Sequence, residues 1–193
     1  MDHPATHQSI DRVFLLDCSG SMESCWDDTI GGFNSFLVDQ KPTGGSLTLV
    51  QFDHEYQLTY ERLKIDEVPP LSRETYKPRG STALLDAIGR LIKEWNSPSN
   101  PSVVILTDGQ ENSSNNFTKA HVKDLIEQKT KEGWTFAYLG ANQDAFAEAG
   151  SIGIAPGCTM NYDVRRTPDA MRTLSAAMSS QASGHSQTVE FKV

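Results

Sequence analysis

Two apolar runs that each end in an aspartate constrain the fold of this chain more than any other feature. Residues 12–17 end in Asp17, and residues 102–108 end in Asp108. Neither run alternates between apolar and polar residues, which is typical of central strands in a sheet covered on both faces. An unpaired carboxylate at the end of a buried strand would be costly, so Asp108 needs a partner.

Apolar residues at helical spacing recur between the strands. The predicted buried stripes of four helices are Trp26, Ile30, Phe33 and Leu37; Leu84, Ile88, Leu91 and Trp95; Val122, Leu125 and Ile126; and Met171, Leu174 and Met178. The second helix is expected to begin at Thr82, the third to be capped by Thr118, and the last by Thr167. A shorter helix over residues 143–148 would stop near Gly150.

The remaining β-prone runs complete an α/β pattern. Residues 46–52 and 56–60 are separated by a short link, which implies an antiparallel hairpin, whereas residues 65–80 contain several prolines and are expected to form a loop. Residues 134–139 and, more weakly, 159–162 are further strands. This alternation predicts a three-layer, doubly wound and mostly parallel sheet with one antiparallel edge strand and helices on both faces.

Length and composition indicate one globular domain. The 193 residues suit a single domain over residues 10–182, followed over 183–193 by a tail or an extra edge strand. The net charge of -8 is scattered along the chain, which disfavours nucleic-acid binding. The chain has no apolar stretch of the ~20 residues that span a bilayer, and its first residues do not resemble a secretion signal. We expect a soluble, cytoplasmic protein that does not bind membranes and whose three cysteines are reduced.

Three segments with small oxygen-bearing side chains should meet where such sheets bind ligands, beyond the carboxyl ends of the strands. Asp17, Ser19 and Ser21 alternate in the turn after the first strand. Thr82 and Asp108 would close the ring from neighbouring loops. Ligands that are all oxygen suit a hard cation, for which Mg²⁺ is the natural choice and Mn²⁺ the alternative.

The charge of this ligand set indicates how such an ion would be used. Three of the five ligands are neutral hydroxyls, and Asp17 and Asp108 are the only acids. The cation would therefore keep positive charge and at least one open position. An Asp or Glu carboxylate of another protein could complete the shell, which makes recognition of a protein partner the favoured function over catalysis.

These residues resemble the von Willebrand factor type A (vWA) family and its metal-ion-dependent adhesion site (MIDAS). Asp17, Ser19 and Ser21 form the family's Asp-x-Ser-x-Ser motif. Residues 80–84 resemble the threonine segment of the family, and residues 106–109 resemble the segment with the last aspartate. Because the three motifs fall in the required order, the resemblance is specific.

The resemblance covers roughly residues 10 to 180 and implies a Rossmann-like sheet, a Mg²⁺ or Mn²⁺ ion held by the five residues, and metal-bridged capture of an acidic side chain. It is closer to the intracellular bacterial or phage members, since a secretion signal and paired cysteines are missing. Such relatives often work beside an ATPase, so an ATPase-containing assembly is one expected partner.

Several residues near the motifs have competing interpretations. Thr82 could act only as a helix cap, and Ser81 is the alternative ligand. Glu111 and Asn112 either surround the site or belong to a solvated loop. Cys18 is interpreted as a spacer because no histidine partner for a catalytic thiol is evident.

Other polar residues have weaker connections to the site. His54 and His121 are expected to be surface or packing residues. Residues 142–144 follow a strand on the same side of the sheet and are candidates for partner contact.

Two other functional classes are consistent with parts of the pattern. A haloacid-dehalogenase-type phosphotransferase also has an aspartate after its first strand beside Mg²⁺, but it needs a second acid where this chain has Ser19. The other alternative is a structural domain with a vestigial site. A serine hydrolase or a nucleotide-binding protein is disfavoured, because the chain has no G-x-S-x-G, P-loop or G-x-G-x-x-G motif.

Overall fold

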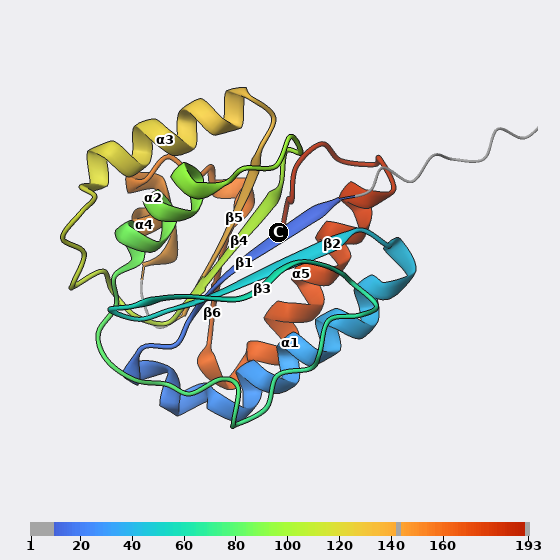
Figure 1. Ribbon diagram of the computed structural model, residues 1–193, viewed down its shortest axis with the longest axis horizontal. Coiled ribbons are helices and arrows are strands. Elements are labelled where there is room, and N and C mark those ends of the chain that lie inside the picture. The colour runs from blue at the N-terminus through green and yellow to red at the C-terminus, as the bar shows by residue number, and fades with distance from the viewer. Residues whose placement is uncertain (1–9, 142–143, 192–193) are drawn as a thin grey trace, which may run out of the picture.

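The computed structural model describes residues 10–141 and 144–191, whose centre is a six-stranded sheet in the order β3-β2-β1-β4-β5-β6 (Figure 1). The strands are β1 (Asp11–Asp17), β2 (Ser46–Phe52), β3 (Tyr56–Lys64), β4 (Ser102–Thr107), β5 (Thr135–Ala141) and β6 (Thr159–Tyr162). All neighbouring strands pair in parallel except β3, which is antiparallel to β2 at one edge. The strand order reverses direction between β1 and β4, so the carboxyl ends of these two strands form the expected ligand-binding edge.

Helices cover both faces of this sheet (Figure 1). They are α1 (Trp26–Gln40), α2 (Leu84–Glu94), α3 (Lys119–Lys131), α4 (Ala145–Ser151) and α5 (Thr167–Ala182). One apolar core lies between the sheet and the helices α1 and α5, and the other lies under α2, α3 and α4. The three-layer α/β prediction is therefore confirmed. No helix in the described part of the chain is long and apolar enough to cross a membrane.

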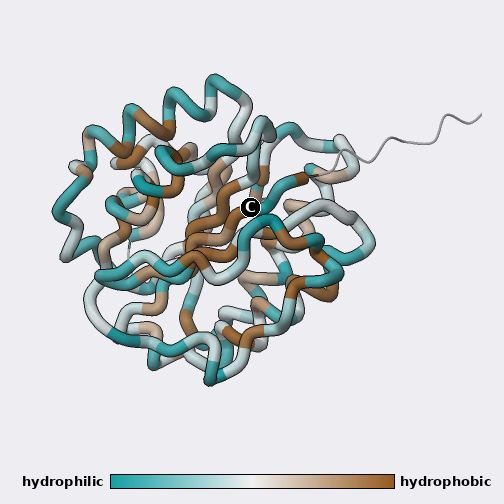
Figure 2. The backbone as a smooth tube through the Cα atoms, viewed as in Figure 1, coloured by the Kyte–Doolittle hydropathy of each residue, from teal (hydrophilic) through white to brown (hydrophobic). Residues whose placement is uncertain are grey.

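Strand β1 explains why its sequence lacks alternation. Phe14 and Leu16 point into the core beneath α1 and α5, while Val13 and Leu15 point into the opposite core. All four side chains are fully buried, and burial of each contributes roughly 1.5–3 kcal/mol. The hydrophobic band through the middle of the molecule follows these central strands (Figure 2).

Some predicted helix boundaries differ from the structure because tertiary contacts replace local caps. Helix α2 begins at Leu84 rather than Thr82, and its first free amides are bonded by a loop that follows β4. Thr167 is the first residue of α5 instead of its cap, since a 3₁₀ turn runs into the helix and the Thr167 hydroxyl donates to the carbonyl of Val164. Helix α4 ends at Ser151, so Gly150 is not its stop; Gly153, with φ +86°, follows instead.

The C-terminal segment over residues 183–191 forms no strand. Val189 and Phe191 are buried in the core beneath α1 and α5. The Phe191 amide also donates a hydrogen bond to the carbonyl of Gly157. This segment therefore adds apolar contacts to the core.

Candidate metal centre

Hydrogen bonds hold both the side chain and the backbone of Asp17 in place. Its side chain is fully buried. Oδ1 accepts a hydrogen bond of 2.7 Å from the Ser19 amide, and Oδ2 accepts one of 2.6 Å from the Thr107 hydroxyl at the end of β4. The Tyr76 hydroxyl donates to the Asp17 carbonyl oxygen over 2.6 Å. These contacts leave the carboxylate a single orientation.

The two aspartates are ionised at an electrostatic cost. Burial raises the pKa of Asp17 to about 6, although hydrogen bonds from Thr107 and Ser19 lower it. Burial also raises the pKa of Asp108, against the hydrogen bond that Ser21 donates. A positive charge between these groups would lower both pKa values and remove part of this cost.

Three hydroxyls from two separate segments surround one point beside Gly109. A side-chain carbon placed on Gly109 would lie 2.9 Å from Thr82 Oγ1, 3.3 Å from Ser21 Oγ and 3.6 Å from Ser19 Oγ. The Ser19 and Ser21 hydroxyls lie 3.1 Å apart, and Ser21 Oγ donates to Asp108 Oδ1 over 2.6 Å. The fold thus brings the five residues expected from the sequence to one place.

Backbone hydrogen bonds hold the first two loops of this site side by side. The Arg79 amide donates to the Cys18 carbonyl over 2.7 Å, and the Gly20 amide donates to the Gly80 carbonyl over 3.0 Å. Gly80 has φ +65°, and a side-chain carbon there would lie 2.2 Å from His54 Nδ1. Only glycine fits this position without strain.

The hydroxyl of Thr82 is not used as a helix cap. Ala83, rather than Thr82, is the residue that precedes α2. The Thr82 amide donates to Asn112 Oδ1 over 2.9 Å, and its carbonyl accepts from the Asn112 amide. Its hydroxyl makes no hydrogen bond within residues 10–141 and 144–191, although Thr82 is only 2% exposed. A hydroxyl without a hydrogen bond on a nearly buried residue is available as a ligand.

The family model for the von Willebrand factor type A domain matches residues 11–177. The chain belongs to this family. vWA domains are in general non-enzymatic modules that mediate protein–protein interactions. No curated protein sequence matches this vWA domain.

Many solved structures share the fold, and 153 chains match it. The vWF domain of the type V pili tip protein Mfa5 from Porphyromonas gingivalis is 11% identical with a TM-score of 0.68, over 91% of this chain and 96% of that one. The pilus adhesin SpaC from Lactobacillus rhamnosus GG is 14% identical with a TM-score of 0.68, over 89% of this chain and 30% of that one.

Proximal thread matrix protein 1 from the mussel byssus, solved with a zinc-occupied MIDAS motif, is 14% identical with a TM-score of 0.64, over 85% of this chain and 46% of that one. The chain spans 42% to 46% of the first three solved chains that it matches. At these identities the likeness concerns the fold.

Of the residues that support the site, the sequence analysis named Glu111 and Asn112 as candidates near it but did not identify Thr107. Thr107 holds the Asp17 carboxylate, and its place directly before Asp108 was the available signal. Glu111 accepts hydrogen bonds from the amides of Leu85, Ser113 and Ser114, so it ties the loop after β4 to the start of α2. Glu111 therefore stabilises the two segments that carry Asp108 and Thr82 in this vWA domain.

The remaining candidates lie outside the group of five residues around Gly109. Burial raises the pKa of Cys18 to about 12, so its thiol stays neutral and fills space as a spacer. His54 Nδ1 lies 3.4 Å from Asp53 Oδ2, and His121 is exposed on α3. Asp144 caps α4 by accepting from the Ala147 amide, whereas residues 142 and 143 lie outside the described residues.

The donor chemistry at this edge is rich in hydroxyls and poor in acids. Within the described ranges, no group of three or more His, Cys, Asp and Glu side chains could hold a metal ion. Two carboxylates and three hydroxyls form a donor set made of oxygen alone, which suits a hard cation and disfavours a soft one.

Proposed function

We propose that this vWA domain binds one divalent cation, Mg²⁺ or Mn²⁺, and through it an Asp or Glu carboxylate of a partner protein. The proposed ligands are Asp17, Ser19, Ser21, Thr82 and Asp108. The observation that carries this proposal is the convergence of three hydroxyls on one point beside Gly109. Helix capping alone would not draw hydroxyls from two distant segments together.

The exposure of the proposed ligands shows which side of the site faces solvent. Asp17, Ser19 and Thr82 are buried, whereas Ser21 is exposed and Asp108 is half-buried. The open side is therefore the side of Ser21 and Asp108. A cation held by two acids keeps its affinity for a third carboxylate, because the neutral hydroxyls do not cancel its charge.

The phosphotransferase alternative lacks a group that its chemistry requires. The position two residues after Asp17 is Ser19, whose hydroxyl lies 3.1 Å from that of Ser21. A hydroxyl in this position is not an acid that could protonate a leaving group. Partner recognition needs no such group, and it agrees with the general role of the family.

Calorimetric titration of chelator-treated protein with Mg²⁺ and Mn²⁺ tests the cation. The wild type should bind, and Thr82→Ala should bind about tenfold more weakly, since one oxygen ligand is lost. Ser81→Ala is the matched control and should bind as the wild type does. Failure of the wild type to bind either ion at millimolar concentration would leave only the interpretation as a structural domain with a vestigial site.

A further inference from the structure

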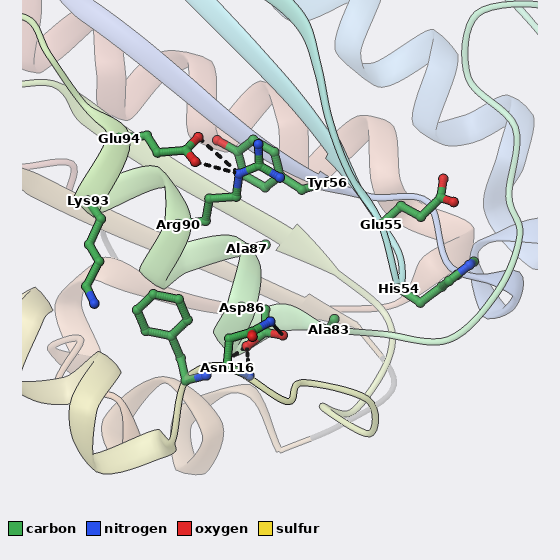
Figure 3. A pocket seen from close by; sticks show the side chains of 11 residues that line it. His54, Glu55, Tyr56, Ala83, Asp86, Ala87, Arg90, Lys93, Glu94 and Asn116 are labelled. Carbon is green, nitrogen blue, oxygen red and sulfur yellow. Dashed lines mark hydrogen bonds and ion pairs between the residues drawn. The ribbon is translucent and has the colours of Figure 1, made fainter.

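A cleft of about 600 Å³ opens beside the metal centre, between the start of β3 and helix α2 (Figure 3). Ala83, the residue directly after Thr82, lines it, and so does Ala87 one turn further along α2. Both side chains are small and leave room in the cleft. The ring of Tyr56 on β3 and the ring of Phe117 in the loop after β4 form two of its walls.

Two features of α2 hold the Phe117 ring in place: a glycine that leaves room for the ring and a carboxylate that binds the loop. Gly89 lies in the middle of α2, where glycine costs about 1 kcal/mol relative to alanine. A side-chain carbon on Gly89 would lie 2.2 Å from the Phe117 ring. The Asp86 carboxylate accepts the amides of Asn115, Asn116 and Phe117, each over 2.9 Å. This cleft is thus formed before any ligand arrives.

Three carboxylates line the cleft, and each has partners: Glu94 accepts from Arg90, Glu55 from Arg79, and Asp86 from the three loop amides.

One cation of the cleft is left without an acidic partner. Arg90 lies 4.4 Å from the centre of the Tyr56 ring, and its Nε donates to Glu94 over 2.9 Å (Figure 3). Lys93 Nζ lies 4.8 Å from the centre of the Phe117 ring. No carboxylate within the described residues lies within 4.0 Å of the Lys93 ammonium. An acidic group next to an aromatic ring complements this wall.

We infer that this cleft is a second anchor for the partner that completes the metal shell, and that it takes an aromatic side chain adjacent to an acidic residue. The inference rests on the proposed function. Lys93 lies eleven residues after Thr82, which corresponds to roughly 15 Å along a helix axis. An extended peptide covers that length in about four or five residues.

Fluorescein-labelled peptides with one aspartate, a spacer of two to four glycines and a Phe-Glu pair test this anchor in Mg²⁺. Peptides that end in Ala-Gln are the comparison. For one spacer length the Phe-Glu peptide should bind about 10- to 100-fold more tightly, from burial of the ring. Equal affinity of the two peptides at every spacer length would overturn the inference.

Variants of the cleft provide the matched controls. Lys93→Gln should weaken the Phe-Glu peptide by about fivefold, as loss of a partly exposed ion pair does. Phe117→Ala should weaken it further, and Lys131→Gln, which alters an exposed lysine on α3, should have no effect. Neither Lys93→Gln nor Phe117→Ala should change Mg²⁺ affinity. Wild-type peptide binding by both Lys93→Gln and Phe117→Ala would refute the inference.

A chelator separates failure of the anchor from failure of the metal centre. If EDTA changes the affinity of neither peptide, the metal proposal fails. The anchor is then tested alone by adding acetyl-Phe-Glu-amide to ¹⁵N-labelled protein in EDTA. Shifts of the Ala83, Ala87 and Phe117 amides are expected, and unchanged amide signals would count against the cleft.

Discussion

Replacing Asp17 with asparagine should stabilise the metal-free protein while abolishing cation binding. The substitution removes a buried negative charge and keeps the shape of the side chain. Asparagine Oδ1 can still accept from the Ser19 amide. Its Nδ2 would donate to Thr107 Oγ1, whose own hydrogen can turn to the Gly109 carbonyl 3.1 Å away. No buried polar group is left without a partner.

The magnitude follows from the pKa of Asp17, which rises from 3.8 to about 6 on folding. Each pKa step of one corresponds to about 1.4 kcal/mol, so ionisation of this group costs the folded protein on the order of 3 kcal/mol. Because the folded pKa is the higher one, the cost is absent below about pH 4 and fully present above about pH 6. Wild-type stability from this group therefore falls as pH rises through that window.

Urea unfolding in EDTA at pH 4 and pH 7.5 measures this difference. The variant should match the wild type at pH 4 and exceed its free energy of unfolding by up to about 3 kcal/mol at pH 7.5. With Mg²⁺ at 100 times its Kd, the wild type should gain about 2.7 kcal/mol and the variant nothing. A variant that is less stable than the wild type in EDTA at pH 7.5 would refute the reasoning.

Three further predictions concern the supports of the site. Gly80→Ala should lower the free energy of unfolding by about 1–3 kcal/mol and weaken Mg²⁺ binding, because φ is +65° and His54 occupies the space. The control is Gly31→Ala on α1, where a side-chain carbon would meet nothing within 4 Å. It should raise the free energy of unfolding by about 0.5–1 kcal/mol in the same urea titration. Thr107→Val should raise the pKa of Asp17 further, since it removes a 2.6 Å hydrogen bond, and calorimetry should show Mg²⁺ affinity failing at a higher pH than in the wild type. Cys18 should resist iodoacetamide at pH 8 in the native protein, because burial raises its pKa to about 12, and mass spectrometry after alkylation checks this.

The α/β fold could be predicted because each central strand and helix has a pattern of its own. The apolar run of β1 has no alternation because both of its faces are buried, and Trp26, Phe33 and Leu37 mark one face of α1 by their spacing. Such patterns depend on neighbours a few residues away, so they can be recognised in a single sequence. Helix ends were less predictable, since the first free amides of α2 are bonded by residues from another loop.

The candidate site separates into local and long-range parts in the same way. The Asp-x-Ser-x-Ser spacing places Asp17, Ser19 and Ser21 in one turn. Because doubly wound sheets bind ligands beyond the carboxyl ends of their strands, Thr82 and Asp108 were expected to join them. Asn112 was a candidate near the site, but its role and that of Thr107 were not visible, because they act on residues that lie 30 and 90 positions away along the chain. Their hydrogen bonds exist only after the strands have paired.

By itself, the sequence determined the α/β pattern and the identity of the candidate ligands, because periodicity and motif spacing are properties of the chain. The tertiary structure alone decided the orientation of Asp17 and the bracing of Thr82. It also formed the cleft beside α2, where Gly89 accepts the ring of Phe117. Each of these features depends on contacts between segments far apart in sequence, and no local pattern encodes such contacts.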